Sequence, residues 1–300
     1  MSSAITAAGD TRVPTGVRGG IARCRAIARR APTAFAGAVI ILFFVFLATF
    51  ADVIAPYDPL MAFPYDVLKP PSAAYWFGTD GNGMDVFSRI IHGSRLAFGI
   101  AVPAVLVATL IGVPLGLFAG YRGGIVDELL LRVMDVLRVF PSIILALAIV
   151  AATGQSLANI VIVIGLVDAP IFARVVRAEV LALRNSNFIE SAVAAGNPLH
   201  RILFVHLLPN AIKGATAQIA VRLAWATRVS ATLAFVGVGV QPPTPEWGAM
   251  IRMGAEYMVT GDWWVALFPG IALVLLVLGF NLLGDGVQDW LDPRRRGAVR

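Results

Sequence analysis

The sequence predicts an all-α membrane protein with six transmembrane helices. Of its 300 residues, 58% are apolar and only 14% are charged, whereas typical soluble domains carry about 25% charged residues. Six apolar runs come close to or exceed the length of about 20 residues that a helix needs to cross a bilayer. They cover residues 34–54, 96–119, 133–152, 158–174, 213–236 and 265–284. This composition excludes an ordinary soluble domain.

The first and fourth runs need separate justification. The first follows Arg29 and Arg30 and resembles a cleavable export signal, but it is longer than the apolar region of about 7–15 residues in such signals. We expect it to be a retained transmembrane helix. The fourth run is short and contains Asp168 and Pro170 near its inner part, so the sequence delimits this helix less sharply than the others.

Basic residues set the expected orientation, because cytoplasmic loops collect Lys and Arg. With the N-terminus inside, 18 of the 24 basic residues lie in cytoplasmic segments and two lie within the fifth run. The remaining four, on the outside, are Lys69, Arg89, Arg95 and Arg252. We therefore predict a multi-pass protein of a bacterial cell membrane with both termini in the cytoplasm. Because these charges flank membrane helices, the net charge of +6 does not indicate a nucleic-acid partner.

This topology divides the chain into membrane, external and cytoplasmic parts. They are an Arg-rich cytoplasmic N-terminal tail (1–33), a first transmembrane helix (34–54), an external segment (55–95), a five-helix core (96–286) and a cytoplasmic C-terminal tail (287–300). The core contains a cytoplasmic loop at 177–212 and an external loop at 237–264. Residues 237–250 include three prolines and three glycines, which predicts a rigid, irregular loop. This loop could form an outer gate or a receptor dock, or simply connect its neighbours.

A polar segment at residues 188–210, here called the hairpin segment, interrupts the apolar pattern. Asn187 and Glu190 have the spacing of a capping box, in which each side chain satisfies a free backbone amide of a helix N-terminus. We therefore expect a short helix that starts after Asn187. Gly196 is expected to end that helix, because glycine adopts the left-handed conformation without steric cost.

A second short helix is expected to follow at once. Asn197 and Pro198 supply the residue types favoured at the N-cap and first position of a helix, and Pro209 is expected to close it. Two short helices meeting at Gly196 would form a hairpin suited to a groove in a partner protein.

The hairpin segment resembles the Glu-Ala-Ala, three residues, Gly signature in the permease subunits of ABC importers. Here the signature is Glu190-Ser191-Ala192 and Gly196, followed by His206-Leu207-Leu208-Pro209-Asn210. Ser191 replaces an alanine but is scarcely larger. In that family the segment inserts into an ATPase subunit. The resemblance implies that the residues coupling this chain to an ATPase are Glu190, Ser191, Ala192, Gly196, His206 and Pro209.

Three further stretches resemble the dipeptide, oligopeptide and nickel branch of these permeases, in the subunit usually placed second. They are Phe77 to Asp80 with Gly83, Asp85, Ser88, Arg89, Gly93 and Arg95; Gly237 to Met250; and Phe280 to Gly286 with Asp292 to Arg294. The resemblance covers about residues 34–296. One departure is Ser230, which stands where the family commonly has a glutamate in its fifth helix, so that carboxylate's role is not carried over.

The resemblance implies an ABC type I importer permease fold with cytoplasmic coupling helices. It also implies four partners: a homologous permease subunit that shares the translocation pathway, two ATPase subunits that bind ATP and Mg, and an external solute-binding protein. The expected cargo is a dipeptide or oligopeptide, although the sequence does not distinguish peptides from nickel or another solute.

ATP hydrolysis is not expected in this chain. A phosphate-binding loop places Gly-Lys-Ser/Thr after a glycine-rich turn, but Lys69 precedes Pro70 and Lys213 precedes Gly214. These two are the chain's lysines. We therefore expect no enzymatic activity and no cofactor in this chain.

Other catalytic and metal-binding patterns are weak. His92 and Ser94 are close in sequence, but nucleophilic catalysis needs them to meet in space near oxyanion donors. His200 and His206 lack a third ligand nearby in the sequence, so we assign no metal site. An intramembrane hydrolase that uses Ser94 is accordingly disfavoured.

Charged residues in the apolar runs are candidates for the translocation pathway, because charge in lipid is costly and usually faces protein or water. Arg222 and Arg228 in the fifth run are the main candidates, and their spacing places them on different faces of one helix. Alternatively, they snorkel or pair with a sister subunit. A secondary transporter driven by an ion gradient is the competing function, but its inverted repeats and paired intramembrane carboxylates are not visible here.

Overall fold

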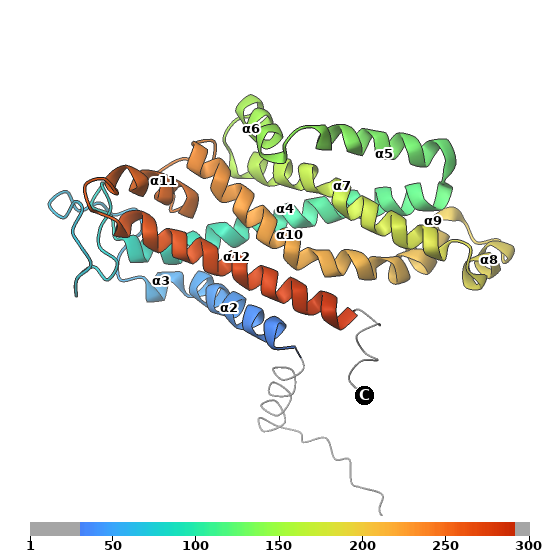
Figure 1. Ribbon diagram of the computed structural model, residues 1–300, viewed down its shortest axis with the longest axis horizontal. Coiled ribbons are helices and arrows are strands. Elements are labelled where there is room, and N and C mark those ends of the chain that lie inside the picture. The colour runs from blue at the N-terminus through green and yellow to red at the C-terminus, as the bar shows by residue number, and fades with distance from the viewer. Residues whose placement is uncertain (1–30, 292–300) are drawn as a thin grey trace, which may run out of the picture.

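Long apolar helices pack along one another in this chain, and their connections gather at the two ends of the bundle (Figure 1). The structure, a computed structural model, describes residues 31–291, and its regular elements there are helical. Of the predicted tails at 1–33 and 287–300, residues 1–30 and 292–300 lie outside the described residues. The prediction of an all-α membrane protein is confirmed.

Five of the described helical segments are long and apolar enough to cross a membrane. The five main helices are α2 (Pro32–Thr49), α4 (Val86–Arg122), α7 (Leu157–Leu183), α10 (Leu208–Val236) and α12 (Trp264–Leu291). Shorter elements are α3 (Ala51–Ile54), α5 (Gly124–Val139), α6 (Ser142–Thr153), α8 (Asn187–Ala194), α9 (Leu199–Arg201), the π-helix η1 (Ile202–Leu207) and α11 (Trp247–Tyr257). A sixth span exists only if α5 and α6 together count as one.

The third predicted span, 133–152, is not one continuous helix. It is divided between α5 and α6, which meet at an angle of 87°. The cause is Pro141: the residue before a proline is pushed out of the helical region, and Phe140 has an extended conformation with φ −85° and ψ 142°. Two Asp–Arg pairs hold α5 against α7, with Asp127 bound by Arg177 through bonds of 2.5 and 2.6 Å and Asp135 bound by Arg174.

Small residues let α4 and α7 approach each other closely. Gly112 and Gly116 lie one turn apart on α4, and a Cβ built at either one would lie 2.4 Å from a carbonyl oxygen of α7, that of Ala169 or Ala173. Lipid is as apolar as the helices, so close backbone packing supplies much of the attraction between them. A glycine likewise lets α2 pack closely against α12, because a Cβ at Gly37 would lie 2.4 Å from the Leu283 nitrogen.

Helix α4 begins ten residues before the apolar run that predicted it, because its first turns are polar but buried. Asp85 caps the helix by accepting a hydrogen bond of 2.8 Å from the Ser88 amide. Arg89 is only 1% exposed and binds the Pro59 carbonyl at 3.0 Å, with Asp80 3.6 Å away. A buried charge is tolerated when it is paired, and here it fastens the preceding loop to the helix.

Gly116→Ala should destabilise the protein by about 1–3 kcal/mol, because its Cβ would collide with the backbone of α7. Gly99 in the same helix is the matched control, since a Cβ there meets nothing within 4 Å. Gly99→Ala should be neutral or stabilising by about 0.5–1 kcal/mol. Thermal unfolding of the detergent-solubilised protein measures both changes, and equal melting temperatures would contradict close helix contact.

Candidate coupling site

The first helix of the hairpin segment starts one residue earlier than predicted, and the capping box is wrong. Ser186, not Asn187, is the N-cap of α8. No side chain caps this helix, and the Ser186 hydroxyl instead donates to the Leu183 carbonyl at 2.6 Å. The carboxylate of Glu190 is therefore not used in a cap. It is exposed, and it has no hydrogen bond or ion pair within residues 31–291.

Gly196 ends the first helix as predicted. Its φ is +73°, a conformation that glycine adopts without steric cost. The Gly196 amide donates to the Val193 carbonyl at 2.9 Å, and the Asn197 amide donates to the Ala192 carbonyl at 3.2 Å. These two bonds form a Schellman motif. The Asn197 side chain adds a third bond to the same Ala192 oxygen, at 2.8 Å.

The second helix differs from the prediction at both ends. Its N-cap is Pro198 rather than Asn197, because Asn197 is used to close the first helix. Pro209 does not end it: helical structure continues from α9 through η1 into α10. Within η1 the bonds shift to the wider π spacing, as in the Leu208 amide donating to Leu203. Pro209 directly follows η1, so the residue without an N–H lies where the helical hydrogen-bond pattern is already changing.

This continuity joins the hairpin segment to the bundle on both sides. Helix α7 enters it through a turn of three residues, 184–186, and α10 leaves it without an interruption. Its buried residues pack inside the chain and are Ile189, Ala192, Ile202, Leu203 and Leu207. Figure 1 shows α8 projecting from one end of the bundle, opposite to the end that carries α11.

The hairpin segment exposes four large apolar side chains, which together are here called its apolar face. This face consists of Phe188, Val193, Phe204 and Val205, which are between 42% and 57% exposed. Several exposed large apolar side chains in a short segment that also presents an unpaired carboxylate are typical of a protein-binding surface. Its position at the end of the bundle makes it accessible to a partner.

The structure divides the six predicted coupling residues between two places. Glu190, Ser191, Ala192 and Gly196 belong to α8 and its end, whereas His206 and Pro209 lie where η1 becomes α10. Glu190, Ser191, Gly196 and Pro209 are exposed. Ala192 is buried and packs inside the chain, and the half-buried His206 has its Nε2 atom buried without a hydrogen-bond partner in the described chain.

The two predicted pathway residues have different surroundings. Arg222 donates to Asp168 of α7 at 3.2 Å, and this carboxylate is only 2% exposed. Arg222 therefore links α10 to α7. The Arg228 side chain is exposed and has no hydrogen-bond or ion-pair partner in the described part of the chain. Two opposite charges in separate apolar runs were a signal that could have predicted the Asp168–Arg222 pair.

Ser230 shares a small cavity with a carboxylate that sequence reasoning missed. Glu246, from the loop before α11, lines this cavity together with Ser230 and Thr227. Its side chain accepts a hydrogen bond of 2.8 Å from the Ala249 amide and so caps α11. Burial raises the pKa of Glu246 to about 7. A carboxyl group thus lies beside Ser230, supplied by the loop rather than by the helix.

The weak catalytic pair does not form. Ser94 is buried and donates to the carbonyl of Ile91, while His92 bonds to the Ser88 carbonyl at 3.0 Å and to Asp52 at 3.2 Å. The histidine and serine therefore have separate partners, and the arrangement needed for an activated nucleophile is absent from these residues.

Comparison with known proteins agrees with this architecture. Residues 112–297, more than half of the chain, match the model of a family described as binding-protein-dependent transport system inner membrane component. The chain belongs to this family of transport permeases. Residues 27–71 of the permease also match the N-terminal TM domain of oligopeptide transport permease C.

Several relatives align with the permease over most of their length. It is 43% identical to the dipeptide transport system permease protein DppC of Alkalihalophilus pseudofirmus, over 88% of this chain and 86% of the relative. It is 42% identical to the glutathione transport system permease protein GsiD of Pectobacterium atrosepticum, over 88% of both chains. The di/tripeptide transport system permease protein DppC of Pseudomonas aeruginosa is 40% identical, over 89% of each.

A solved structure shares the fold of the permease. It is a chain of the MetNI methionine ABC transporter, solved in inward-facing conformations. The two structures align with a TM-score of 0.55 and 22% identity, over 68% of the permease and 96% of the MetNI chain. The expected ABC importer permease fold is therefore confirmed.

Asp168→Asn should destabilise the permease by about 3–5 kcal/mol, because it leaves the partly buried Arg222 without its counter-charge. Replacing both residues by leucine should cost less than the single change, since no unpaired charge is left in the apolar interior. Thermal unfolding of the single and double variants measures this difference. A double leucine variant that is at least as destabilised as Asp168→Asn would contradict a direct interaction.

Proposed function

We propose that this permease is the second of two homologous permease subunits in an ATP-driven importer of short peptides. In this proposal the hairpin segment docks on an ATPase subunit. The observation that carries the proposal is the exposed apolar face of the hairpin segment, which lies at one end of the bundle and is continuous with α10. Its residues Glu190 and Gly196 also match the signature of ABC importer permeases.

Energy would come from two partner ATPases, which bind ATP and Mg and close together on ATP binding. A docked hairpin must move with the surface that holds it. Because α7 and α10 are attached to the hairpin segment with few or no flexible residues between, its displacement would tilt both helices. The ATPases can shift the equilibrium between the two conformations only by the difference in docking free energy between them.

The translocation pathway would lie between this permease and its homologue. A solute-binding protein would deliver the cargo from outside, and both termini would lie in the cytoplasm together with the hairpin segment. The distribution of basic residues supports this orientation. Membership of a binding-protein-dependent transport family also favours this mechanism over a secondary transporter driven by an ion gradient.

The cargo is proposed from the relatives. Their names state dipeptide, di/tripeptide and glutathione transport, and all three cargoes are short peptides with a free α-carboxylate. We propose the same chemical class for this permease.

Gly196→Asp should leave membrane insertion intact but abolish ATP-driven uptake. Gly196 has a positive φ, so a side chain there costs about 1–2 kcal/mol and distorts the end of α8, and the new carboxylate would lie beside the docking face. The measurement is uptake of a radiolabelled dipeptide by cells, together with the amount of permease in the membrane.

Gly261 provides the matched control, because it also has a positive φ and a Cβ there meets nothing within 4 Å. It lies in the predicted external loop, so Gly261→Asp should preserve uptake. Normal uptake by the Gly196→Asp variant, or equal losses in both variants, would contradict the proposed coupling role.

A further inference from the structure

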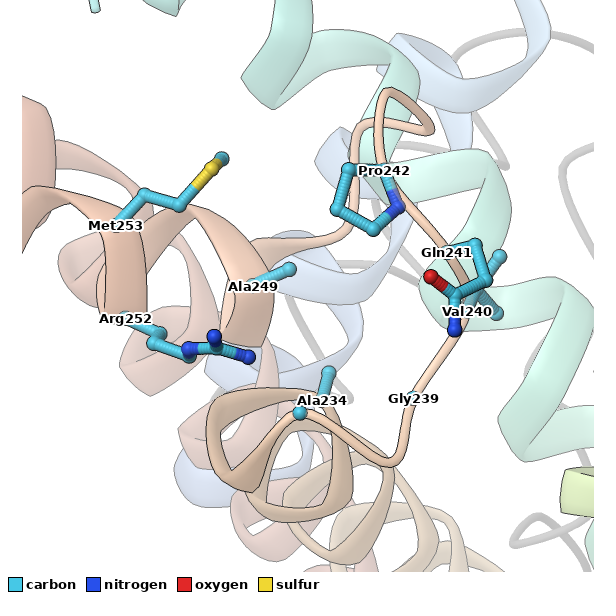
Figure 2. Close-up of a pocket in the computed structure, with 9 residues that line it drawn as sticks. Ala234, Gly239, Val240, Gln241, Pro242, Ala249, Arg252 and Met253 are labelled. Carbon is cyan, nitrogen blue, oxygen red and sulfur yellow. The ribbon is translucent and has the colours of Figure 1, made fainter. Parts of the chain in front are cut away.

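A cavity of about 320 Å³ lies at the end of the bundle opposite to the hairpin segment. This volume falls at the lower end of the range for small-molecule sites, about 300–1,000 Å³. Figure 2 shows its two sides, with Ala249, Arg252 and Met253 of α11 facing the loop that carries Gln241 and Pro242. None of the residues that line it is acidic.

Arg252 brings an uncompensated positive charge to this cavity. Of the three arginines predicted to lie outside, Arg89 is close to Asp80 and Arg95 is paired with Asp52. The Arg252 side chain is exposed and has no hydrogen bond or ion pair within residues 31–291. Its guanidinium group is therefore free to bind an anion.

The loop beside Arg252 supplies further donors. In the described chain the backbone N–H groups of Gly239, Val240 and Gln241 have no hydrogen-bond partner. Backbone amides without a partner are available as donors to an anion. Gly237 makes room for the arginine, because a Cβ at this position would lie 2.4 Å from the Arg252 Nη1 atom.

The loop is also held in place by its surroundings. Gln155, in the turn between α6 and α7, donates to the Gly237 carbonyl at 3.2 Å and accepts a hydrogen bond from the Gln241 side chain. Gly239 lies directly on α10, where a Cβ would be 2.4 Å from the Cα of Ala234. A site whose donors are fixed in advance loses less entropy when it binds a ligand.

We propose that this cavity binds the α-carboxylate of a short peptide, with Arg252 as the principal contact, as the peptide enters the pathway from outside. Arginine suits this task because its planar guanidinium group can donate two parallel hydrogen bonds to one carboxylate. The geometry of the cavity supports an anion site, whereas the assignment of the anion as a peptide carboxylate rests on the proposed function. Arg252 is thereby a determinant of substrate specificity.

The test measures the reaction of Arg252 with p-hydroxyphenylglyoxal, an arginine-selective reagent, in the intact complex purified through a tag on this chain. Mass spectrometry quantifies the adduct at Arg252 in the presence of dialanine or of dialaninamide, which lacks the carboxylate. With dialanine at about ten times its dissociation constant, adduct formation should slow by about tenfold. The amide should give little protection.

Arg122, at the end of α4, is the internal control, because its side chain is also exposed, has no partner in the described chain and lies in a predicted cytoplasmic segment. Its reaction rate should not change with either peptide. An Arg252 rate that is unaffected by dialanine, or slowed equally by the amide, would overturn the proposal. Dialanine uptake by the same importer separates the two hypotheses: protection without uptake refutes the proposed cargo and supports the site, and uptake without protection refutes the site alone.

Discussion

The helical continuity between the hairpin segment and the membrane bundle is the constraint on which the proposed mechanism depends. A short exposed helix can bind a partner, but it transmits movement only if its connections are stiff. Here α9, η1 and α10 form one helical run from Leu199 to Val236, and three residues join α7 to α8. A displacement of α8 is therefore passed on to the attached helices, because no long flexible loop separates them.

Packing inside the bundle explains how such a displacement could spread. Glycines at α4 bring its backbone against α7, and the Asp168–Arg222 pair joins α7 to α10. Close backbone contacts of this kind move as rigid units rather than deforming continuously. The cavity beside Arg252 lies between the far end of α10 and α11, so the same helix connects the proposed docking surface with the proposed carboxylate site.

Much of this organisation could be predicted from the sequence, because it depends on strong local preferences. Apolar runs predicted the main helices, and the conformational freedom of Gly196 predicted the end of α8. The failures came where tertiary structure competed with local preference. Pro141 broke the third run into two helices, and Pro209 was accommodated at a π-helical stretch instead of ending a helix. The polar start of α4 is buried by a loop that hydropathy does not reveal.

The candidate site was predicted less completely than the fold. The signature residues located the hairpin segment, but their spacing suggested a capping box between Asn187 and Glu190 that the structure does not contain. The exposure of Phe204 and Val205 depends on tertiary packing, which the sequence pattern does not reveal. Likewise, no local sequence pattern predicts a role for Arg252, because the cavity that it lines is formed by α10, the following loop and α11 together.

The most direct test of the central claim is photocrosslinking from the hairpin segment in intact membranes. A photoreactive amino acid at Val193, on its exposed face, would be compared with one at Val259, an exposed valine of the predicted external loop. The account predicts that Val193 captures an ATP-hydrolysing subunit, identified by mass spectrometry, and that Val259 does not. Failure of Val193 to reach any ATPase, or equal capture from both positions, would contradict it.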